Sequence, residues 1–241
     1  MLTPLLKGLN SLLFASVCLG CRHPVEEACG VPLCPECTRQ LPHSRPPWCL
    51  GCGRSLAGTG AGVDRCLRCR LRVRPFPFDR VVSPFLYEGT VRRLIWALKY
   101  QGRLSLIPAL TDWMARAVQE RPGAERSDLC TPVPLHSTRL RERGFNQADR
   151  LARALAERLH LPLRTDLLVR RRATWAQTEL PRSRRRFNLQ GAFSLNPSVS
   201  VRGLRILLVD DVLTTGSTAA ACARVLKAAG AQWVTVAALA S

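Results

Sequence analysis

Apolar residues follow two different periods from about residue 79 onward. Short apolar runs predict strands over residues 80–87, 128–133, 167–169, 205–209 and 233–239. Apolar positions at helical spacing predict helices over residues 91–100, 106–119, 147–159 and 218–229. The run at 205–209 is apolar almost throughout, as in a strand that is buried on both faces of a parallel sheet. Strands that alternate with helices in this way predict an α/β fold built on a parallel sheet.

The first 78 residues show a different pattern. Leucines at helical spacing predict a short amphipathic helix within residues 1–17, which we expect to dock on the body of the protein. Residues 18–78 contain Gly, Pro and Arg but few large aliphatic side chains. We therefore divide the chain into a helix (1–17), a cysteine-rich segment (18–78) and an α/β domain (79–241). No run of about 18 apolar residues occurs, which excludes a membrane-spanning helix.

Eight of the 11 cysteines form four Cys-x-x-Cys pairs: Cys18/Cys21, Cys34/Cys37, Cys49/Cys52 and Cys66/Cys69. Two residues between thiolates let both sulfurs face one ion, and a second pair completes a tetrahedral site. Pairing in sequence order predicts two structural zinc ions, and a cross-braced pairing is the alternative. Because the segment lacks the side chains for a core, bound metal would supply its folding energy.

The cysteines and the apolar stretch at residues 12–17 also allow another interpretation. A secreted disulfide module is dense in cysteine, and a leader peptide contains such an apolar stretch. Cleavage at Cys21 would destroy the first cysteine pair, however, and the leucines before it follow helical spacing. Four repeated pairs fit structural zinc in a reducing compartment, so we expect a cytoplasmic protein.

The apolar strand at residues 206–209 leads directly into Asp210 and Asp211. A turn rich in hydroxyl groups follows, formed by Thr214, Thr215, Gly216, Ser217 and Thr218. Where such a turn joins a parallel strand to a helix, backbone N–H groups and hydroxyls gather at a positive helix N-terminus, which favours a monophosphate. Two carboxylates would repel that phosphate unless a polyol or a divalent cation lay between them. A sugar phosphate meets both requirements, with ribose hydroxyls on the acids and the 5-phosphate in the turn. The alternative is an exposed strand end followed by an ordinary helix cap.

The charge balance favours an anionic partner. Lys and Arg number 36 against 17 Asp and Glu, which gives a formal net charge of +19, and all but three of these cations are arginine. Residues 139–205 hold 16 arginines and five acids, which is +11 of that total. Trp175 and Phe187 lie near enough to stack on bases beside two arginine clusters, which predict binding of single-stranded DNA: Arg170, Arg171, Arg172 and Arg184, Arg185, Arg186. The alternative is that arginine serves throughout as a general surface cation.

Residues 210–218 closely resemble the 5-phosphoribosyl 1-diphosphate (PRPP) motif of type I phosphoribosyltransferases. The whole chain resembles the ComF family, whose members include competence proteins for DNA uptake. Beside the cysteine pairs, three internal stretches carry this likeness: LKYQGR at 98–103, RGFNQ at 143–147 and RFNLQGAF at 186–193. The resemblance implies a double zinc ribbon before a type I phosphoribosyltransferase-like domain. It also implies that this domain binds PRPP together with Mg²⁺ at Asp210, Asp211 and the turn that follows.

The resemblance assigns further parts of the site. Residues 131–134 stand where such folds place a loop that contacts the diphosphate, and residues 174–186 suit a mobile hood over the reaction centre. The residues assigned in this way to the diphosphate or substrate are Lys99, Thr131, Pro132, Arg139 and Arg143.

Two functions follow from the resemblance and the charge. One is a Mg²⁺-dependent phosphoribosyltransferase of unassigned acceptor, with Asp210 and Asp211 at its reaction centre, linked to natural competence and DNA uptake or to nucleotide metabolism. The alternative is a non-catalytic protein that binds single-stranded DNA and uses PRPP as a regulatory ligand. In a third interpretation, the zinc ribbons dock proteins of the DNA-uptake machinery, such as a helicase or a pore component.

Overall fold

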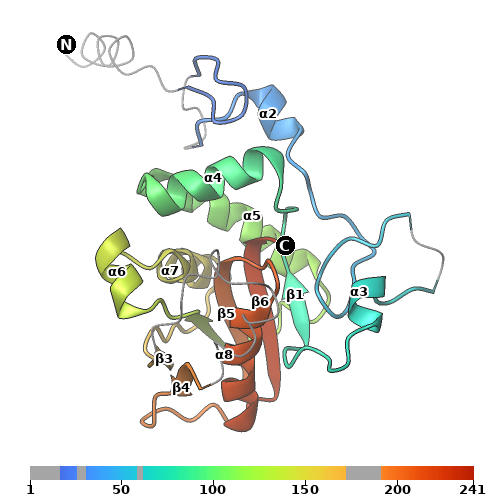
Figure 1. Cartoon of the computed structure of the whole chain (residues 1–241), viewed down its shortest axis with the longest axis vertical. Coiled ribbons are helices and arrows are strands. Elements are labelled where there is room, and N and C mark those ends of the chain that lie inside the picture. Colours follow the sequence, from blue (N-terminus) through green and yellow to red (C-terminus); the bar gives the residue numbers. More distant parts are fainter. Residues whose placement is uncertain (1–16, 26–30, 59–61, 172–190) are drawn as a thin grey trace.

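A parallel four-stranded sheet forms the centre of the computed structural model, which describes residues 17–25, 31–58, 62–171 and 191–241 (Figure 1). Its strands run in the order β1 (Arg80–Val82), β6 (Trp233–Ala240), β5 (Arg205–Val212) and β2 (Leu129–Pro132). The register places Asp210 of β5 beside Ala238 of β6 and Pro132 of β2 beside Val209 of β5. The carboxyl ends of β5 and β2 therefore meet at one edge of the sheet. The predicted parallel α/β fold is confirmed.

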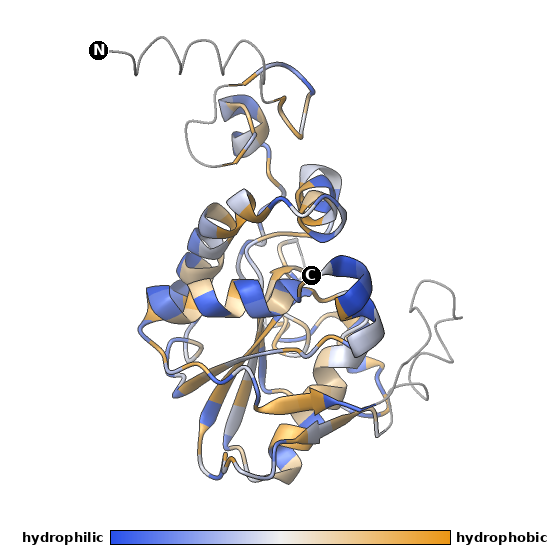
Figure 2. Cartoon of the chain, turned by 90° about the vertical axis from the view of Figure 1, so that its left-hand side faces the viewer, coloured by the Kyte–Doolittle hydropathy of each residue, from blue (hydrophilic) through white to orange (hydrophobic). Residues whose placement is uncertain are grey.

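Helices cover both faces of the sheet. Three helices pack on one face: α4 (Gly89–Tyr100), α5 (Ile107–Glu120) and α7 (Gln147–Leu159). Helix α8 (Ser217–Ala228) packs on the other face. Side chains alternate along β5, so Leu207 and Val209 join the core under the three helices, whereas Ile206 and Leu208 join the core under α8. Hydrophilic and hydrophobic residues alternate along the surface helices in Figure 2, as expected for helices with one buried face.

The apolar pattern does not predict two short elements of the structure. One is helix α6 (Ser137–Arg143), which follows β2, and the other is a strand, β4 (Phe193–Leu195). The predicted strand at residues 167–169 appears as β3 (Leu168–Arg170), but it pairs antiparallel with β4 (Phe193–Leu195) in a separate two-stranded sheet. This strand therefore lies outside the parallel sheet.

Most of the remaining predicted bounds agree with the structure to within a few residues. The strand expected over residues 80–87 is the exception, because β1 ends at Val82 and Pro84 follows shortly after it. A 3₁₀ turn, η1 (Leu104–Leu106), precedes α5. The helix expected within residues 1–17 lies outside the described residues. Among the helices that the structure describes, none reaches the length and apolar content that a membrane span requires.

The cysteine-rich segment packs directly on the α/β domain. We call Cys18, Cys21, Cys34 and Cys37 the first knuckle unit, which includes helix α2 (Pro35–Arg39). We call Cys49, Cys52, Cys66 and Cys69 the second knuckle unit, which includes helix α3 (Leu67–Arg70). Arg93 of α4 donates hydrogen bonds to the carbonyl groups of Leu19 (2.6 Å) and Gly20 (3.2 Å) in the first unit. The second unit lies beside β1 (Figure 1), where an added Cβ at Gly53 would come within 2.8 Å of Val81.

Candidate sugar-phosphate site and cysteine clusters

Two adjacent carboxylates stand at the carboxyl end of β5. Asp211 is 9% exposed, and the backbone N–H of Asp211 donates a 2.9 Å hydrogen bond to Oδ1 of Asp210. Strand β5 continues through both residues to Val212, because its backbone pairs with β6 as far as Ala240. The sheet itself therefore fixes the positions of the two acids.

Lys99 of α4 reaches this acid pair from the neighbouring layer. Its Nζ lies 2.7 Å from Oδ2 of Asp211, and the two side chains are only 19% and 13% exposed. Burial alone would lower the pKa of Lys99, but the carboxylates of Asp211 and Asp210 outweigh it, so this pKa is raised. The structure thus places Lys99, which the resemblance assigned to the diphosphate or substrate, against the acid pair.

Asp210 has an unusual charge state for a carboxyl group. Burial, followed by the Asp211 carboxylate, raises the pKa of Asp210 to about 7, against the opposing influence of Lys99 and Arg170. Asp210 is therefore partly protonated near neutral pH. The summed charge of Asp210, Asp211 and Lys99 therefore lies between zero and −1. This small charge reduces the repulsion that a nearby phosphate would meet.

The hydroxyl loop, residues 214–218, connects the acid pair to α8. The hydroxyl oxygens of Thr215 and Ser217 lie 2.9 Å apart, and the N–H of Ser217 donates to Oγ1 of Thr215 (3.3 Å). Gly216 caps α8 with φ +73°, in the left-handed region that favours glycine. Gly216 itself has no side chain to occupy the N-terminus of α8, and a helix N-terminus beside hydroxyl groups forms a surface suited to an anion.

Phe76 closes one side of the hydroxyl loop. A Cβ added at Gly216 would lie 2.8 Å from Cε1 of Phe76. Phe76 in turn stacks on Phe78, with ring centroids 4.6 Å apart, and the Arg72 guanidinium lies 3.8 Å from its ring centroid. The sequence gives no signal for this role, because Phe76 lies in the Pro-rich connection after the second knuckle unit.

The end of β2 lies beside the acid pair, but its side chains turn inward. Thr131 and Pro132 are buried, and the Thr131 hydroxyl donates a 2.8 Å hydrogen bond to the carbonyl of Arg164. Arg143 of α6 lies instead against the end of α4. It donates to Oε1 of Gln147 (3.2 Å), and its guanidinium stands 5.1 Å from the Tyr100 ring centroid. The structure therefore brings Arg143 next to the residue that follows Lys99.

Arg170 lies closer to this site than the charge pattern suggested. Burial, then Arg139 on α6, lowers the pKa of Arg170, whereas Cys222 and Asp210 act in the opposite direction. Its guanidinium stands 5.4 Å from the Phe193 ring centroid. The neighbouring Arg171 donates a 2.7 Å hydrogen bond to the Ser194 hydroxyl. The charges of Arg139 and of Asp210 thus both act on Arg170. Arg172, Arg184, Arg185, Arg186 and the rest of the expected hood lie outside the described residues.

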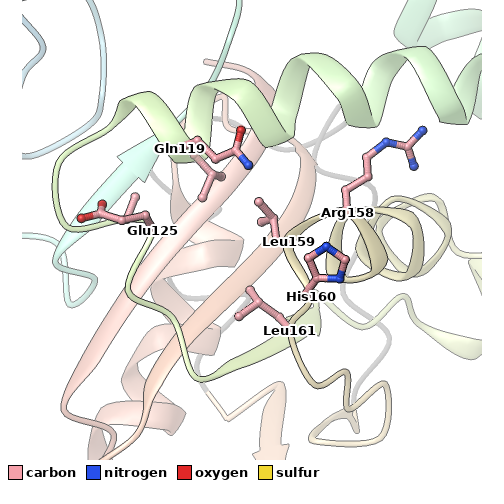
Figure 3. Close-up of a pocket in the computed structure, with 8 residues that line it drawn as sticks. Gln119, Glu125, Arg158, Leu159, His160 and Leu161 are labelled. Atoms are coloured by element: carbon pink, nitrogen blue, oxygen red, sulfur yellow. The ribbon is translucent and has the colours of Figure 1, made fainter.

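A separate cavity of about 240 Å³ lies where α5 and α7 end, near the amino end of β2. Figure 3 shows Gln119, Glu125, Arg158 and His160 around it. Arg158 is already paired with Asp112 of α5. Although it is more spacious than the surface beside the hydroxyl loop, this cavity lies at the edge of the sheet opposite the acid pair. Location and chemistry, rather than volume, therefore identify the candidate site.

The eight paired cysteines form two compact clusters of four sulfurs. Within each knuckle unit all Sγ atoms lie within 4.8 Å of one another. The Sγ atoms of Cys21 and Cys34 are 3.7 Å apart, as are those of Cys52 and Cys66. A tetrahedral zinc ion with Zn–S bonds of about 2.3 Å requires sulfurs about 3.8 Å apart. The clusters fit zinc, and they follow the sequence-order pairing rather than the cross-braced alternative.

Backbone N–H groups support the sulfurs of both clusters. The Cys18 sulfur accepts from the N–H groups of Gly20 (3.3 Å), Cys21 (3.5 Å) and Cys34 (3.3 Å). Cys66 likewise donates to the Cys49 sulfur (3.3 Å). Such donors stabilise the thiolate relative to the thiol, and the thiolate is the form that binds a metal.

The sheet edge with its acid pair and hydroxyl loop defines the class of this domain. Residues 142–241 match the family described as the phosphoribosyl transferase domain. Over most of its length the chain is 35% identical to the DNA utilization protein YhgH of Salmonella typhimurium (207 residues, 85% of this chain and 88% of the relative). It is 31% identical to competence protein F of Haemophilus influenzae, over 91% of this chain and 94% of the relative. It is 28% identical to competence protein ComFC of Bacillus subtilis, over 87% and 77%. The chain belongs to the ComF family of competence and DNA utilization proteins.

Proposed function

We propose that the chain binds PRPP together with Mg²⁺ at the edge formed by β5, the hydroxyl loop and α8. One observation carries this proposal: an acid pair partly neutralised by Lys99 stands directly before a donor-rich loop at a helix N-terminus. The acids accept hydrogen bonds from ribose hydroxyls, and the loop donates to the 5-phosphate. The match of residues 142–241 to the phosphoribosyl transferase domain supports this assignment.

The remaining polar residues of the site suit the diphosphate of PRPP. Arg139 and Arg143 lie on α6, beside the sheet edge, and a guanidinium pairs well with phosphate oxygens. Carboxylate oxygens are ligands that Mg²⁺ accepts, but Lys99 already engages Asp211, so we expect the ion to arrive on the oxygens of PRPP itself. A bound Mg²⁺ would supply positive charge to offset the negative charge of the leaving diphosphate. In a transfer, the bond from C1 of ribose to the diphosphate oxygen breaks with its electron pair, and a nucleophilic acceptor forms the new bond to C1.

Calorimetric titration with PRPP, with and without Mg²⁺, tests the proposal directly. The double variant Asp210→Asn, Asp211→Asn removes the charged acceptors and should weaken PRPP binding by roughly 2–4 kcal/mol. A matched variant, Asp149→Asn with Glu157→Gln, removes the same charge from α7 and should bind like the unaltered protein. Equal affinity of a folded Asp210→Asn, Asp211→Asn variant would refute the assignment.

We propose single-stranded DNA as a second ligand, on the outer surface of α4 and α6. Trp96 and Tyr100 are 54% and 60% exposed, and their ring centroids lie 5.9 Å apart. Arg143 lies beside Tyr100, and Arg92 lies 5.6 Å from the ring centroid of Tyr87. Exposed aromatic rings flanked by arginines suit stacking on bases and contact with a phosphate backbone. The names of the relatives, which refer to competence and DNA utilization, support a role in DNA uptake.

Binding of single-stranded DNA over a salt series tests this second ligand. The variant Trp96→Ala, Tyr100→Ala should lower affinity without changing the salt dependence, because stacking releases no counterions. Replacing Arg184, Arg185 and Arg186 with Gln should reduce the slope of the logarithm of the binding constant against the logarithm of the salt concentration. For single strands this slope is about −0.7 per phosphate neutralised. The variant Leu67→Ala, Leu71→Ala alters exposed apolar residues on the second knuckle unit and serves as the control. If only this control weakens binding, the DNA site lies on the knuckle units instead.

A further inference from the structure

The second knuckle unit and the hydroxyl loop share one hollow. Among the described residues it is lined by Cys52, Arg54 and Arg68 from the knuckle unit, by Thr214, Thr215 and Gly216 from the loop, and by Leu213 and Ser241 beside them. Phe76 completes the wall between them. Cys52 of the second knuckle unit thus lies at the same hollow as the loop to which we assign phosphate binding.

Close packing fixes how this unit sits on the α/β domain. Phe76 packs against the small core of the second knuckle unit and also against the core under α8. On the loop side, Gly216 leaves no room for a methyl group beside the Phe76 ring; on the sheet side, Gly53 leaves none beside Val81 of β1. Neither contact leaves space for an additional carbon atom. Together they fix the position of the second knuckle unit relative to the loop, so the side chains of the unit have a defined position at the hollow.

The charged side chains that line the hollow are all positive. Arg54 and Arg68 are both exposed, and neither forms a salt bridge with any residue that the structure describes. No acidic residue is among those that line the hollow. On the opposite side stand the hydroxyls of Thr214 and Thr215. Two guanidinium groups without carboxylate partners therefore face a wall that donates hydrogen bonds.

We propose that Arg54 and Arg68 of the second knuckle unit complete the phosphate site of the α/β domain. The ligand is a phosphate monoester dianion, such as the 5-phosphate of a pentose. Its inner oxygens accept from the hydroxyl loop and the start of α8, and its outer oxygens accept from the two guanidinium groups. This proposal deepens the sugar-phosphate site described above and rests on it. It gives the cysteine-rich segment a direct part in ligand binding.

Titration of the zinc-loaded full chain with ribose 5-phosphate tests this proposal. The variant Arg54→Gln, Arg68→Gln should weaken binding by about tenfold or more, since two charge-assisted contacts are lost. The variant Arg65→Gln, Arg70→Gln removes the same charge from exposed positions of the same unit that do not line the hollow, and it should stay within about twofold of the unaltered protein. Elemental analysis should give the same zinc content for all three proteins.

Each other outcome overturns the proposal in a recognisable way. Equal weakening by both variants would show a long-range charge effect rather than contact. A loss of zinc with unchanged ligand affinity would show that Arg54 and Arg68 only balance the charge of the thiolates. Weaker DNA binding with intact ribose 5-phosphate binding would assign them to a phosphodiester. If PRPP binds and depends on Asp210 and Asp211 while the Arg54, Arg68 variant is unaffected, only this inference fails. If the unaltered chain binds neither ligand, the proposed function fails with it.

Discussion

The ammonium group of Lys99 lies 2.7 Å from a carboxylate oxygen of Asp211, although α4 and β5 belong to distant parts of the sequence. Both side chains are largely buried, so water screens the pair only weakly. This ion pair joins a helix on one face of the sheet to the residues that we assign to ribose.

Replacing Lys99 with Met should both destabilise the fold and weaken PRPP binding. Removing one partner of a buried pair leaves the other without compensation, which costs about 3–5 kcal/mol. Lys227→Met breaks a pair of the same length with Asp79, away from the site (2.7 Å). Thermal unfolding should show a loss for both variants, whereas calorimetry should show weaker PRPP binding for Lys99→Met alone. Unchanged PRPP affinity in folded Lys99→Met would count against a role of Lys99 in the site.

Asp210 should contribute a fall in the free energy of unfolding as pH rises from about 4 to 7. The groups that face this carboxyl are Asp211, Lys99, Arg170 and Cys222. Folding raises the pKa of Asp210 from its ordinary 3.8 to about 7, so in this window the folded chain holds a proton that the unfolded chain has lost. Unfolding then releases a proton, and higher pH favours it.

Urea unfolding at about pH 5 and about pH 8 measures this dependence. Asp210→Asn cannot ionise, so its free energy of unfolding should fall less between the two values than that of the unaltered protein. Asp149→Asn, on the outer side of α7, is the control and should follow the unaltered protein. A parallel fall in Asp210→Asn would mean that Asp210 is ionised throughout.

Gly216→Ala should destabilise the chain and weaken ribose 5-phosphate binding. The left-handed conformation costs an alanine about 1–2 kcal/mol, and the new methyl group would meet the Phe76 ring. Gly203→Ala has a similar φ (+77°) but open space around it, so the difference between the two variants measures the contact with Phe76. Adding Phe76→Ala to Gly216→Ala should recover part of that difference. Equal effects of the two single variants would mean that Phe76 does not restrain the loop.

Native mass spectrometry should find two zinc ions per chain, one in each knuckle unit. Cys34→Ser and Cys52→Ser should each lose one ion while the α/β domain keeps its circular dichroism spectrum. Only Cys52→Ser disturbs the unit beside the hydroxyl loop, so only this variant should also lose affinity for ribose 5-phosphate. Purified protein that contains disulfides in place of zinc would contradict the assignment.

The local elements of the fold could be predicted, because their signals lie within a few residues. Helix α7 has the predicted bounds, since Asn146 caps its first turn and His160 ends it in a left-handed conformation. Strand β5 runs three residues further than predicted, because pairing with β6 outweighs the polarity of Asp210 and Asp211. Elements of few residues, such as α6 and β4, carry too little periodicity to be predicted.

The candidate site could be predicted only as far as it is contiguous. The acid pair and the hydroxyl loop follow one strand, so their order in sequence is their order in space. The contacts of Lys99, Arg170 and Phe76 come from three other parts of the chain, and only tertiary packing brings them to β5 or its loop. The sequence marked Lys99 through a family signature and Arg170 through its charge, but neither signal gives its contact.

The order of strands in the sheet has a consequence for biosynthesis. Among the described strands, β1 pairs only with β6, and β2 pairs only with β5 in the main sheet, yet β5 and β6 are translated last. At about 5–20 residues per second, β1 is translated roughly 8–30 s before its partner. Both groups of four cysteines are complete well before that time. A nascent chain can therefore take up both metal ions long before the hydroxyl loop, which lies against the second knuckle unit, has been translated.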